Sequence, residues 1–285
     1  MGYVDFILNL AGLLLWLNWC SVRFDPLEKR TPATLLGTLR PAAPGKNRRW
    51  QLLVYIAALL FFRAVIYRWL GGATGWLGRL DLGVVVLPFR NDWWARSLVF
   101  SFLSFGLTLV IFYMALLFLS LLHGPDPLHR LVKIPLGRVD GWPRWAKITL
   151  PFILTVLAWC SLTWLLGWLQ ISPRLTMTLR VEQSLIMALN LYLVWQFPAG
   201  ALLVLHLLNS YIYFGPHPFW HYVNVTAQTL LRPLEKIPLR LGRVDFAPVM
   251  GMALVFLFSE LMENGVKMSH LHLPGLVDLY GKLPF

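Results

Sequence analysis

Long apolar runs separated by short polar stretches make up most of this chain. A helix needs roughly 20 apolar residues to cross a bilayer core about 30 Å thick. Six runs approach or exceed that length, and they cover residues 4–22, 50–70, 97–122, 146–169, 184–214 and 247–266. The fifth run is long for one span, and we expect Pro198 to kink it. The sixth is the weakest, because Glu260 and Glu263 interrupt it. The pattern predicts an all-α, polytopic membrane protein with about six transmembrane helices.

The first run has almost no basic segment before it and no small-x-small cleavage pattern, so we expect a retained helix and not a cleaved signal peptide. Two connections, residues 80–89 and 175–180, have sequences typical of extended chain. The last residues, 271–285, are apolar and bounded by prolines. These segments could cover one surface or meet a partner.

The connections after the first, third and fifth runs share a pattern. The third connection, residues 215–248, contains GPHP followed by KIPLRLGRVD, and residues 124–140 contain GPDP followed by KIPLGRVD. The first connection keeps the front half of the pattern. Prolines exclude one continuous helix in the third connection, while the spacing within residues 219–231 predicts an amphipathic helix. The sequence therefore predicts three helix–linker–helix repeats with amphipathic linkers.

These repeats divide the chain into residues 1–70, residues 71–170 with an outer loop, and residues 171–285 with a short outer tail. The three linkers hold most of the lysines and arginines, whereas the opposite side holds fewer, including Arg63 and Arg68 just inside the second run. The positive-inside rule then predicts cytoplasmic linkers and both termini outside. We expect a multi-pass protein of a bacterial cytoplasmic membrane.

Composition agrees with a membrane protein, because 58% of residues are hydrophobic and 13% are charged. The formal net charge is +12, but the cations lie mostly beside apolar runs. Anionic lipid headgroups explain them more simply than nucleic acid does. Cys20 and Cys160 both fall in apolar runs, and no CxxC or zinc spacing occurs.

The repeated linkers supply the candidate contact residues for lipid or a partner. An acid before a proline-led helix can cap it, and we expect Asp140 and Asp245 to do so. The linker candidates are Arg40, Pro41, Gly137, Arg138, Asp140, Arg232, Pro233, Gly242, Arg243, Asp245 and Pro248.

A second set of candidates is polar and lies within the apolar runs. Glu260 and Asn264 are one turn apart on one helical face, and such a carboxylate could relay a proton or bind a cation. The alternative is an acid near the interface, with Glu263 paired to Lys267. Asn18 and Asn209 each end a run and are expected to cap helix ends or to hydrogen-bond there.

Histidines offer the remaining candidates for cofactor or metal chemistry. His206 could be an axial haem ligand, but no other run has an interior histidine, so interhelical hydrogen bonding is favoured. The pairs His217 with His221 and His270 with His272 have no third ligand nearby in sequence. We expect no cofactor and no metal. The sequence also contains no GxSxG, Walker, HExxH or GxGxxG motif.

The third linker resembles that of the YggT family of bacterial and plastid membrane proteins, on Pro218, Arg232-Pro233-Leu234, Ile237-Pro238, Gly242-Arg243 and Asp245-Phe246-Ala247-Pro248. Ala247 stands where that family usually has serine, and Arg243 replaces a second glycine. The first two units match in part. The resemblance implies repeated helix pairs and roles in osmotic tolerance, in placement of membrane complexes or division, or, in plastid relatives, in attaching haem to a cytochrome b. It implies no catalytic residue.

The main hypothesis is a non-enzymatic scaffold, accessory subunit or assembly factor of a membrane protein complex. Its expected partners are anionic lipids and other membrane subunits or a second copy of the chain, with no nucleic acid. The alternative is a small ion or osmolyte transporter or channel, with a path past Glu260. A haem assembly factor is a third hypothesis, and it depends on the resemblance alone.

Overall fold

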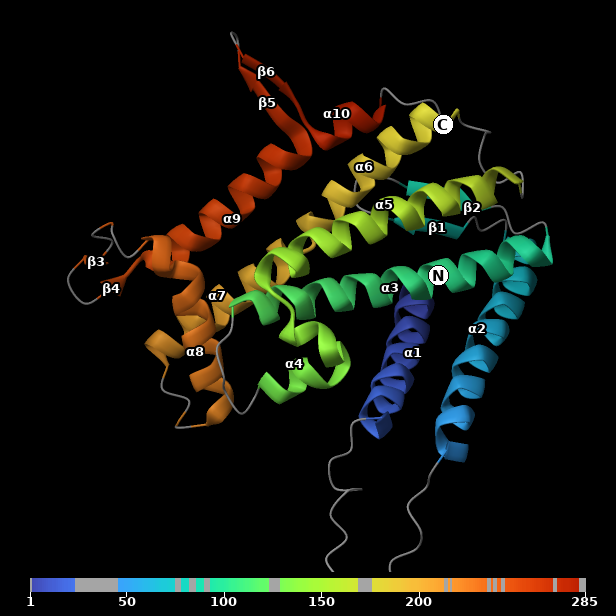
Figure 1. The fold of residues 1–285 in the computed structure, drawn as a ribbon, viewed down its shortest axis with the longest axis horizontal. Helices are drawn as coiled ribbons and strands as arrows, with labels where there is room; N and C mark the ends of the chain where they lie inside the picture. Colours follow the sequence, from blue (N-terminus) through green and yellow to red (C-terminus); the bar gives the residue numbers. More distant parts are fainter. Residues whose placement is uncertain are drawn as a thin grey trace, which may run out of the picture. The chain divides into compact units, whose positions relative to one another are not determined.

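The structure is a computed structural model, and it describes residues 2–23, 46–74, 78–81, 86–89, 93–122, 129–168, 176–212, 215, 217–234, 237, 240–241, 244–268 and 271–281. Helices dominate these residues (Figure 1). Five segments are long and apolar enough to cross a membrane: 3–21, 50–69, 94–122, 144–168 and 177–211. They lie in α1 (Gly2–Arg23), α2 (Lys46–Thr74), α3 (Trp94–Leu122), α5 (Arg144–Trp168) and the pair α6 (Met177–Leu193) and α7 (Gln196–Tyr211).

This result confirms a largely helical chain with several candidate membrane spans, which is compatible with a multi-pass membrane protein. The sixth apolar run forms α9 (Ala247–Asn264), which ends in the polar residues predicted to weaken it and is not among the five segments. The six-helix count and the three-repeat organisation therefore stay predictions.

The regular hydrogen bonding of the fifth apolar run is interrupted just before Pro198, although Val194 and Trp195 keep helical dihedral angles. α6 ends at Leu193 and α7 begins at Gln196, and the chain between them makes tighter backbone hydrogen bonds, from Val194 N to Leu191 O and from Trp195 N to Tyr192 O. Pro198 follows within the first turn of α7, where its missing N–H cannot bond back to Val194. The proline effect was predicted, and the structure places the interruption just before the proline.

The described parts of the second and third linkers contain helices at the predicted places, whereas residues 24–45 of the first linker lie outside the described residues. The second contains α4 (His129–Leu136) and the 3₁₀ helix η3 (Gly137–Gly141). The third contains α8 (Pro218–Leu231), η4 (Arg232–Leu234), and the strands β3 (Arg240–Leu241) and β4 (Val244–Asp245), which pair antiparallel. α8 confirms the helix predicted over 219–231, and it buries the single face Val223, Thr226, Ala227 and Leu231.

Two further segments form small two-stranded sheets. β1 (Gly78–Asp81) pairs with β2 (Val86–Phe89), which agrees with extended chain over part of 80–89. β5 (Gly265–Met268) pairs antiparallel with β6 (Leu271–Pro274), and α10 (Leu276–Gly281) follows.

The prediction of extended chain at 175–180 is wrong for residues 177–180, because α6 already begins at Met177. The alternating residues there are too few to oppose a long helix that extends back from the apolar run, and Ser184 Oγ donates to the carbonyl of Arg180 within it.

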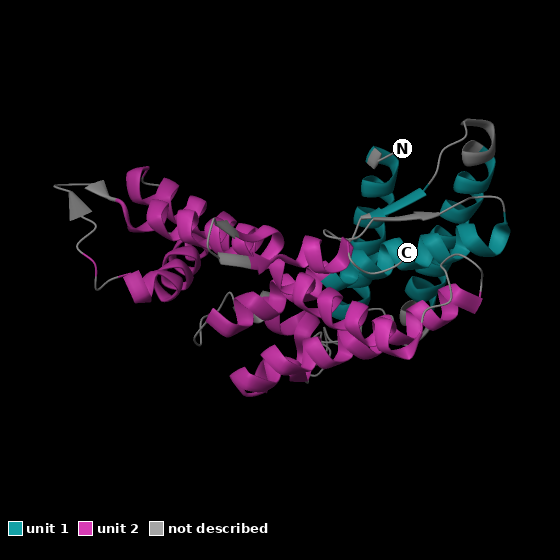
Figure 2. Ribbon diagram, turned by 90° about the horizontal axis from the view of Figure 1, so that it is seen from above, with its two compact units in different colours: residues 1–80, 87–110 teal, residues 81–86, 111–285 magenta. Residues whose placement is uncertain are grey.

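The chain divides into two compact units (Figure 2). Unit 1 contains residues 1–80 and 87–110, and unit 2 contains residues 81–86 and 111–285, so α3 contributes to both. The three-repeat boundaries 1–70, 71–170 and 171–285 are a different division and remain a prediction.

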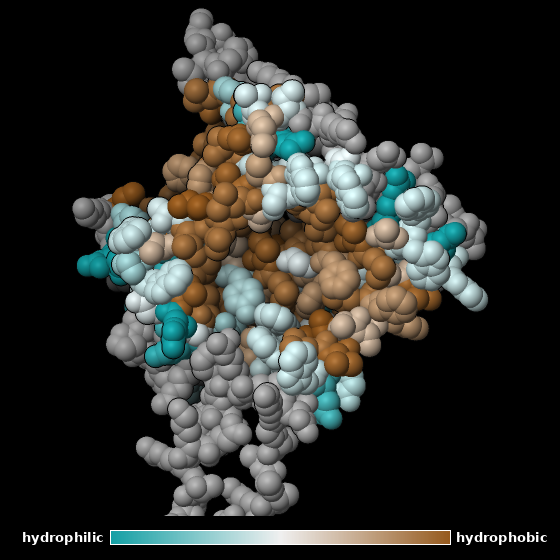
Figure 3. Space-filling view, turned by 45° about the vertical axis from the view of Figure 1, so that its right-hand side comes forward, coloured by the Kyte–Doolittle hydropathy of each residue, from teal (hydrophilic) through white to brown (hydrophobic). Residues whose placement is uncertain are grey.

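Each unit has its own packing. In unit 1, α1 lies beside α2 (Figure 1), and the core contains Ile56, Leu60 and Phe105. Gly12 permits close approach there, because a Cβ would lie 2.6 Å from the Phe105 ring. In unit 2, α7 packs against α8 and α9, and α5 packs against α6. Many large apolar side chains are exposed, and Figure 3 shows them gathered over much of one face. Such a surface suits contact with lipid tails.

Candidate functional site

A fully buried arginine lies within the second candidate span. Arg63 in α2 has 0% of its side chain exposed. Tyr67, also buried, follows one turn later on the same helical face. An arginine stays protonated at all physiological pH values, so its charge must be balanced within the protein.

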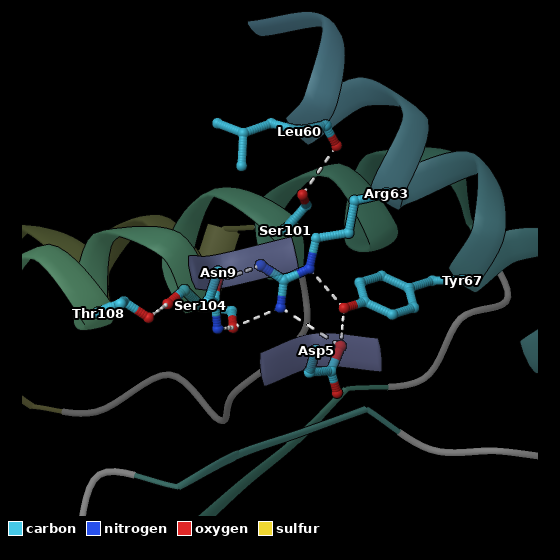
Figure 4. Close-up of polar contacts among 8 residues, drawn as sticks. All are labelled: Asp5, Asn9, Leu60, Arg63, Tyr67, Ser101, Ser104 and Thr108. Carbon is cyan, nitrogen blue, oxygen red and sulfur yellow. Dashed lines mark hydrogen bonds and ion pairs between the residues drawn. The ribbon is translucent and has the colours of Figure 1, made fainter. Parts of the chain in front are cut away.

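The Arg63 guanidinium uses all three of its nitrogens (Figure 4). Nε donates to the Tyr67 hydroxyl, and Nη1 donates to Asn9 Oδ1 at 2.6 Å. Nη2 donates to Ser104 Oγ at 2.7 Å and lies 3.4 Å from Asp5 Oδ1. The Tyr67 hydroxyl in turn donates to Asp5 Oδ1. We call these five residues the Arg63 network.

The helical period brings the acceptors together. Asp5 and Asn9 are four residues apart in α1 and therefore share one face. Ser104 comes from α3 and also accepts from Asn9 Nδ2 at 3.3 Å. Three helices of unit 1 thus converge on one charge, and Ser101 Oγ adds a bond from α3 to the Leu60 carbonyl of α2 at 2.8 Å.

The Arg63 network is electrically balanced, with one cation and one carboxylate. The planar guanidinium of Arg63 donates hydrogen bonds to several acceptors at fixed angles, and the ammonium of a lysine cannot replace it in this geometry. Removing one member of a buried ion pair is strongly destabilising, because the other charge then lacks compensation. The arrangement therefore fixes how α1, α2 and α3 pack within unit 1.

A second buried charge lies in unit 2, at the junction of α3, η3 and α5. Lys147, 6% exposed, donates to Ser120 Oγ at 2.7 Å and lies 3.9 Å from Asp140 Oδ1. Ser120 Oγ donates to the same carboxylate oxygen at 2.6 Å. We call these three residues the Lys147 network. It joins the end of α3 to the start of α5 through the linker between them.

Local backbone geometry places Asp140 in this network. Gly137 begins η3 with φ of 58°, a left-handed conformation that favours glycine. The chain then turns so that Asp140 reaches Ser120 and Lys147. Asp140 was expected to cap the helix that follows it, and its contacts with Ser120 and Lys147 were not predicted from the sequence.

The prediction that Asp245 caps α9 is not tested, because the Asp245 side chain lies outside the described residues. The N-cap residue is Phe246, which makes no side-chain capping bond, and Asp245 lies in β4. Pro248 in the first turn already lacks an N–H, so this helix start has one fewer backbone donor to satisfy.

The other linker candidates are mostly at the surface. Arg138, Arg232 and Pro233 are exposed, whereas Pro248 is buried. Arg40, Pro41, Gly242 and Arg243 lie outside the described residues.

Glu260 and Asn264 lie on one face of α9, and Asn264 Nδ2 donates to Glu260 Oε1 at 2.7 Å. Both side chains are exposed in the chain as described. α9 ends at Asn264, so Lys267 belongs to β5 and not to the helix. The predicted pairing of Glu263 with Lys267 is not tested, because the Lys267 side chain lies outside the described residues.

His206 Nδ1 lies 2.9 Å from Asn224 Oδ1, which confirms an interhelical hydrogen bond between α7 and α8. His217 accepts from Phe219 N and caps α8. Asn18 contributes its carbonyl to Ser21 Oγ, and Asn209 lies partly exposed near the end of α7. No group of three or more metal-binding side chains occurs among the described residues.

The residues that converge on Arg63 and Lys147 were not predicted from the sequence. A signal existed for the first network, because Arg63 precedes Tyr67 by four residues, as Asp5 precedes Asn9. Comparison of the chain with protein-family models, with curated proteins and with solved structures finds no match. Membership of the YggT family therefore stays a prediction from the linker motif.

Proposed function

We propose that this chain is a non-enzymatic scaffold, accessory subunit or assembly factor of a membrane protein complex. The observation that carries the proposal is the exposed Glu260–Asn264 pair on α9. A protein partner provides better surroundings for this pair than lipid does.

The exposed apolar residues beside Glu260 support a contact with another polypeptide. Phe256 and Leu257, one turn earlier, are 49% and 53% exposed, and Leu261 is also exposed. These positions share the outward side of α9 with Glu260. A carboxylate on an apolar face is costly against lipid tails, and hydrogen-bond donors of a neighbouring helix reduce that cost. This face therefore supports packing against another polypeptide.

The two buried networks support the same role. Arg63 and Lys147 are each held by side chains of two or more elements. Such contacts favour fixed helix packing, which suits a protein whose task is to position other subunits.

The test is native mass spectrometry of the tagged chain, extracted from its own membranes in mild detergent. We expect a stoichiometric complex, and we expect Glu260→Gln to lower retention of the partner about 10- to 100-fold. That range corresponds to losing a charged hydrogen bond of about 1.5–3 kcal/mol.

Glu263→Gln is the matched control, because it removes the same charge from the same helix at a less exposed position. Partner retention should stay near the wild-type value in this variant. A wild-type chain that is a bare monomer would contradict the scaffold role. A complex that Glu260→Gln leaves intact would contradict the contact site.

A small transporter is the second candidate, favoured by two observations in unit 2. The helical hydrogen bonding of the candidate span 177–211 is interrupted at Val194 and Trp195, and interrupted helices occur at the binding sites of transporters. Gln183 in α6 is buried, and neither its amide oxygen nor its nitrogen has a hydrogen-bond partner among the described residues. Such an amide could hold a polar solute.

For the transporter role, a substitution at Gln183 should affect solute flux and stability differently. Gln183→Leu should leave stability unchanged or raised, because it removes an unpaired amide, but it should abolish solute flux in proteoliposomes. Absence of any flux in the wild type would end this candidate.

A further inference from the structure

The second linker carries an excess of positive charge beside a membrane span. Between His129 and Lys147 the sequence has one acid, Asp140, and the cations Arg130, Lys133, Arg138, Arg144 and Lys147. The Lys147 network occupies the only acid of this segment, because Asp140 accepts from Ser120 and pairs with Lys147. The remaining cations of the segment therefore have no acid within it.

The fold directs three of those cations outward. α4 packs Val132 and Leu136 against Met114 and Leu117 of α3, and this leaves Lys133 exposed on the other side. The left-handed turn at Gly137 then begins η3, on which Arg138 is exposed. Arg144, also exposed, begins α5.

Two tryptophans accompany these cations. Trp142 and Trp145 lie at the start of α5 and are 39% and 70% exposed. The candidate span of α5 begins at Arg144, so both rings lie within about one turn of the place where that span starts. Tryptophan is enriched at the headgroup level of membranes, where one side of the ring meets apolar groups and the N–H meets polar ones.

We infer that α4, η3 and the first turn of α5 form a binding surface for anionic phospholipid headgroups. Lys133, Arg138 and Arg144 contact the phosphates, and Trp142 and Trp145 lie at the boundary with the acyl chains. The Lys147 network positions η3, so that its cations stay directed to the surface. This inference does not depend on the scaffold role.

Position and chemistry together favour lipid over an acidic protein as the occupant. α3 ends at Leu122 and α5 begins at Arg144, so the linker joins the same ends of two candidate spans. Headgroup phosphates are the anions present at such an end. Each cation near an anionic surface contributes about fivefold in binding, which corresponds to about 1 kcal/mol.

The test is native mass spectrometry of the purified full chain in mild detergent, titrated with dioleoylphosphatidylglycerol or with dioleoylphosphatidylcholine. We expect the wild type to retain phosphatidylglycerol in clear preference to phosphatidylcholine. The triple variant Lys133→Gln, Arg138→Gln, Arg144→Gln should lose that preference, by up to about 100-fold if the three contributions multiply. Higher salt should weaken the preference of the wild type, because it screens exposed charge.

Arg79→Gln is the matched control for Arg138→Gln, because Arg79 is an exposed arginine in β1, next to Gly78, which lies close to Phe100 in the N-terminal half of α3. Arg138→Gln should lower the preference about fivefold, and Arg79→Gln should leave it unchanged. Trp145→Ala should shorten lipid retention without removing the preference for the anionic lipid.

Equal binding of the two lipids by the wild type would overturn the inference. A triple variant that keeps the wild-type preference would overturn it too, as would an equal effect of Arg79→Gln and Arg138→Gln. The elution profile of each variant in size-exclusion chromatography checks folding, and the single variant Arg138→Gln decides the matter where the triple variant does not elute as the wild type does.

Discussion

The Arg63 network and the Lys147 network each compensate the charge of a buried cation, but they do so with different sets of partners. Both bury a cation beside an apolar run, and both pair it with a carboxylate. Arg63 spreads its bonds over four side chains from three helices of unit 1. Lys147 shares one serine hydroxyl and one carboxylate near the start of its helix in unit 2.

The difference follows from the chemistry of the two cations. A guanidinium has five donors in a fixed plane and therefore needs several acceptors at defined places. An ammonium is a compact charge that a small group of oxygens can satisfy. Arg63 consequently specifies the relative positions of three helices, whereas Lys147 specifies one linker against two helix ends. Four predictions test this distinction, from the largest expected effect to the smallest.

The largest effect should come from Arg63→Ala. The substitution leaves the Asp5 carboxylate without its cation and leaves Asn9, Tyr67 and Ser104 without a shared donor. We expect the free energy of unfolding to fall by about 3–5 kcal/mol, measured by titration with sodium dodecyl sulfate and tryptophan fluorescence. Arg79→Ala, at an exposed site, should change it by less than about 0.5 kcal/mol.

Replacing both charges should separate the two networks. Asp140→Asn with Lys147→Met removes both charges of a simple pair. The free energy of unfolding of this double variant should therefore lie within about 1 kcal/mol of the wild-type value. Asp5→Asn with Arg63→Met leaves neutral polar groups unpaired and should remain about 2–3 kcal/mol less stable. If the two double variants differ equally from the wild type in free energy of unfolding, the extra acceptors of Arg63 contribute nothing to stability.

Tyr67→Phe isolates one acceptor of the Arg63 network. Its hydroxyl accepts from Arg63 and donates to Asp5, so both bonds involve a charged group. We expect a loss of about 2 kcal/mol in the same unfolding assay. Tyr192→Phe is the comparison, because that hydroxyl donates to the neutral carbonyl of Ile148, and its loss should amount to about 1 kcal/mol or less.

The smallest effect concerns the turn that places Asp140. Gly137→Ala puts a Cβ on a residue with φ of 58° and should cost about 1–2 kcal/mol. Gly106→Ala is the reference, because it lies within α3 with no atom within 4 Å of the added Cβ. That variant should gain about 1 kcal/mol from helix propensity. Equal stability of the two alanine variants would contradict a structural role for the turn.

The apolar pattern predicted the spans well because length and hydropathy decide them locally. The proline effect near residue 198 and the helix over 219–231 also follow from neighbouring residues, and both are present in the structure. The prediction of extended chain at 177–180 was wrong, because it depended on a few residues whose preference a longer helix overrode.

The Arg63 network could not be predicted from the sequence, and the reason is a different one. Its members come from α1, α2 and α3, and their convergence depends on how three helices rotate against each other. The spacing within each helix indicates a polar face but not its partner. His206 was predictable as an interhelical contact, whereas the identity of Asn224 as its partner needed the structure.

The buried arginine also constrains the order in which the chain can enter a membrane. On insertion scales an arginine at the centre of a spanning helix adds about 2.5–3.5 kcal/mol to the free energy of integration. The ribosome delivers α1 before α2, so Asp5 and Asn9 precede Arg63 into the bilayer, and Ser104 follows on α3. Two of the acceptors of Arg63 are therefore already synthesised when α2 emerges, and the acceptor on α3 is added afterwards.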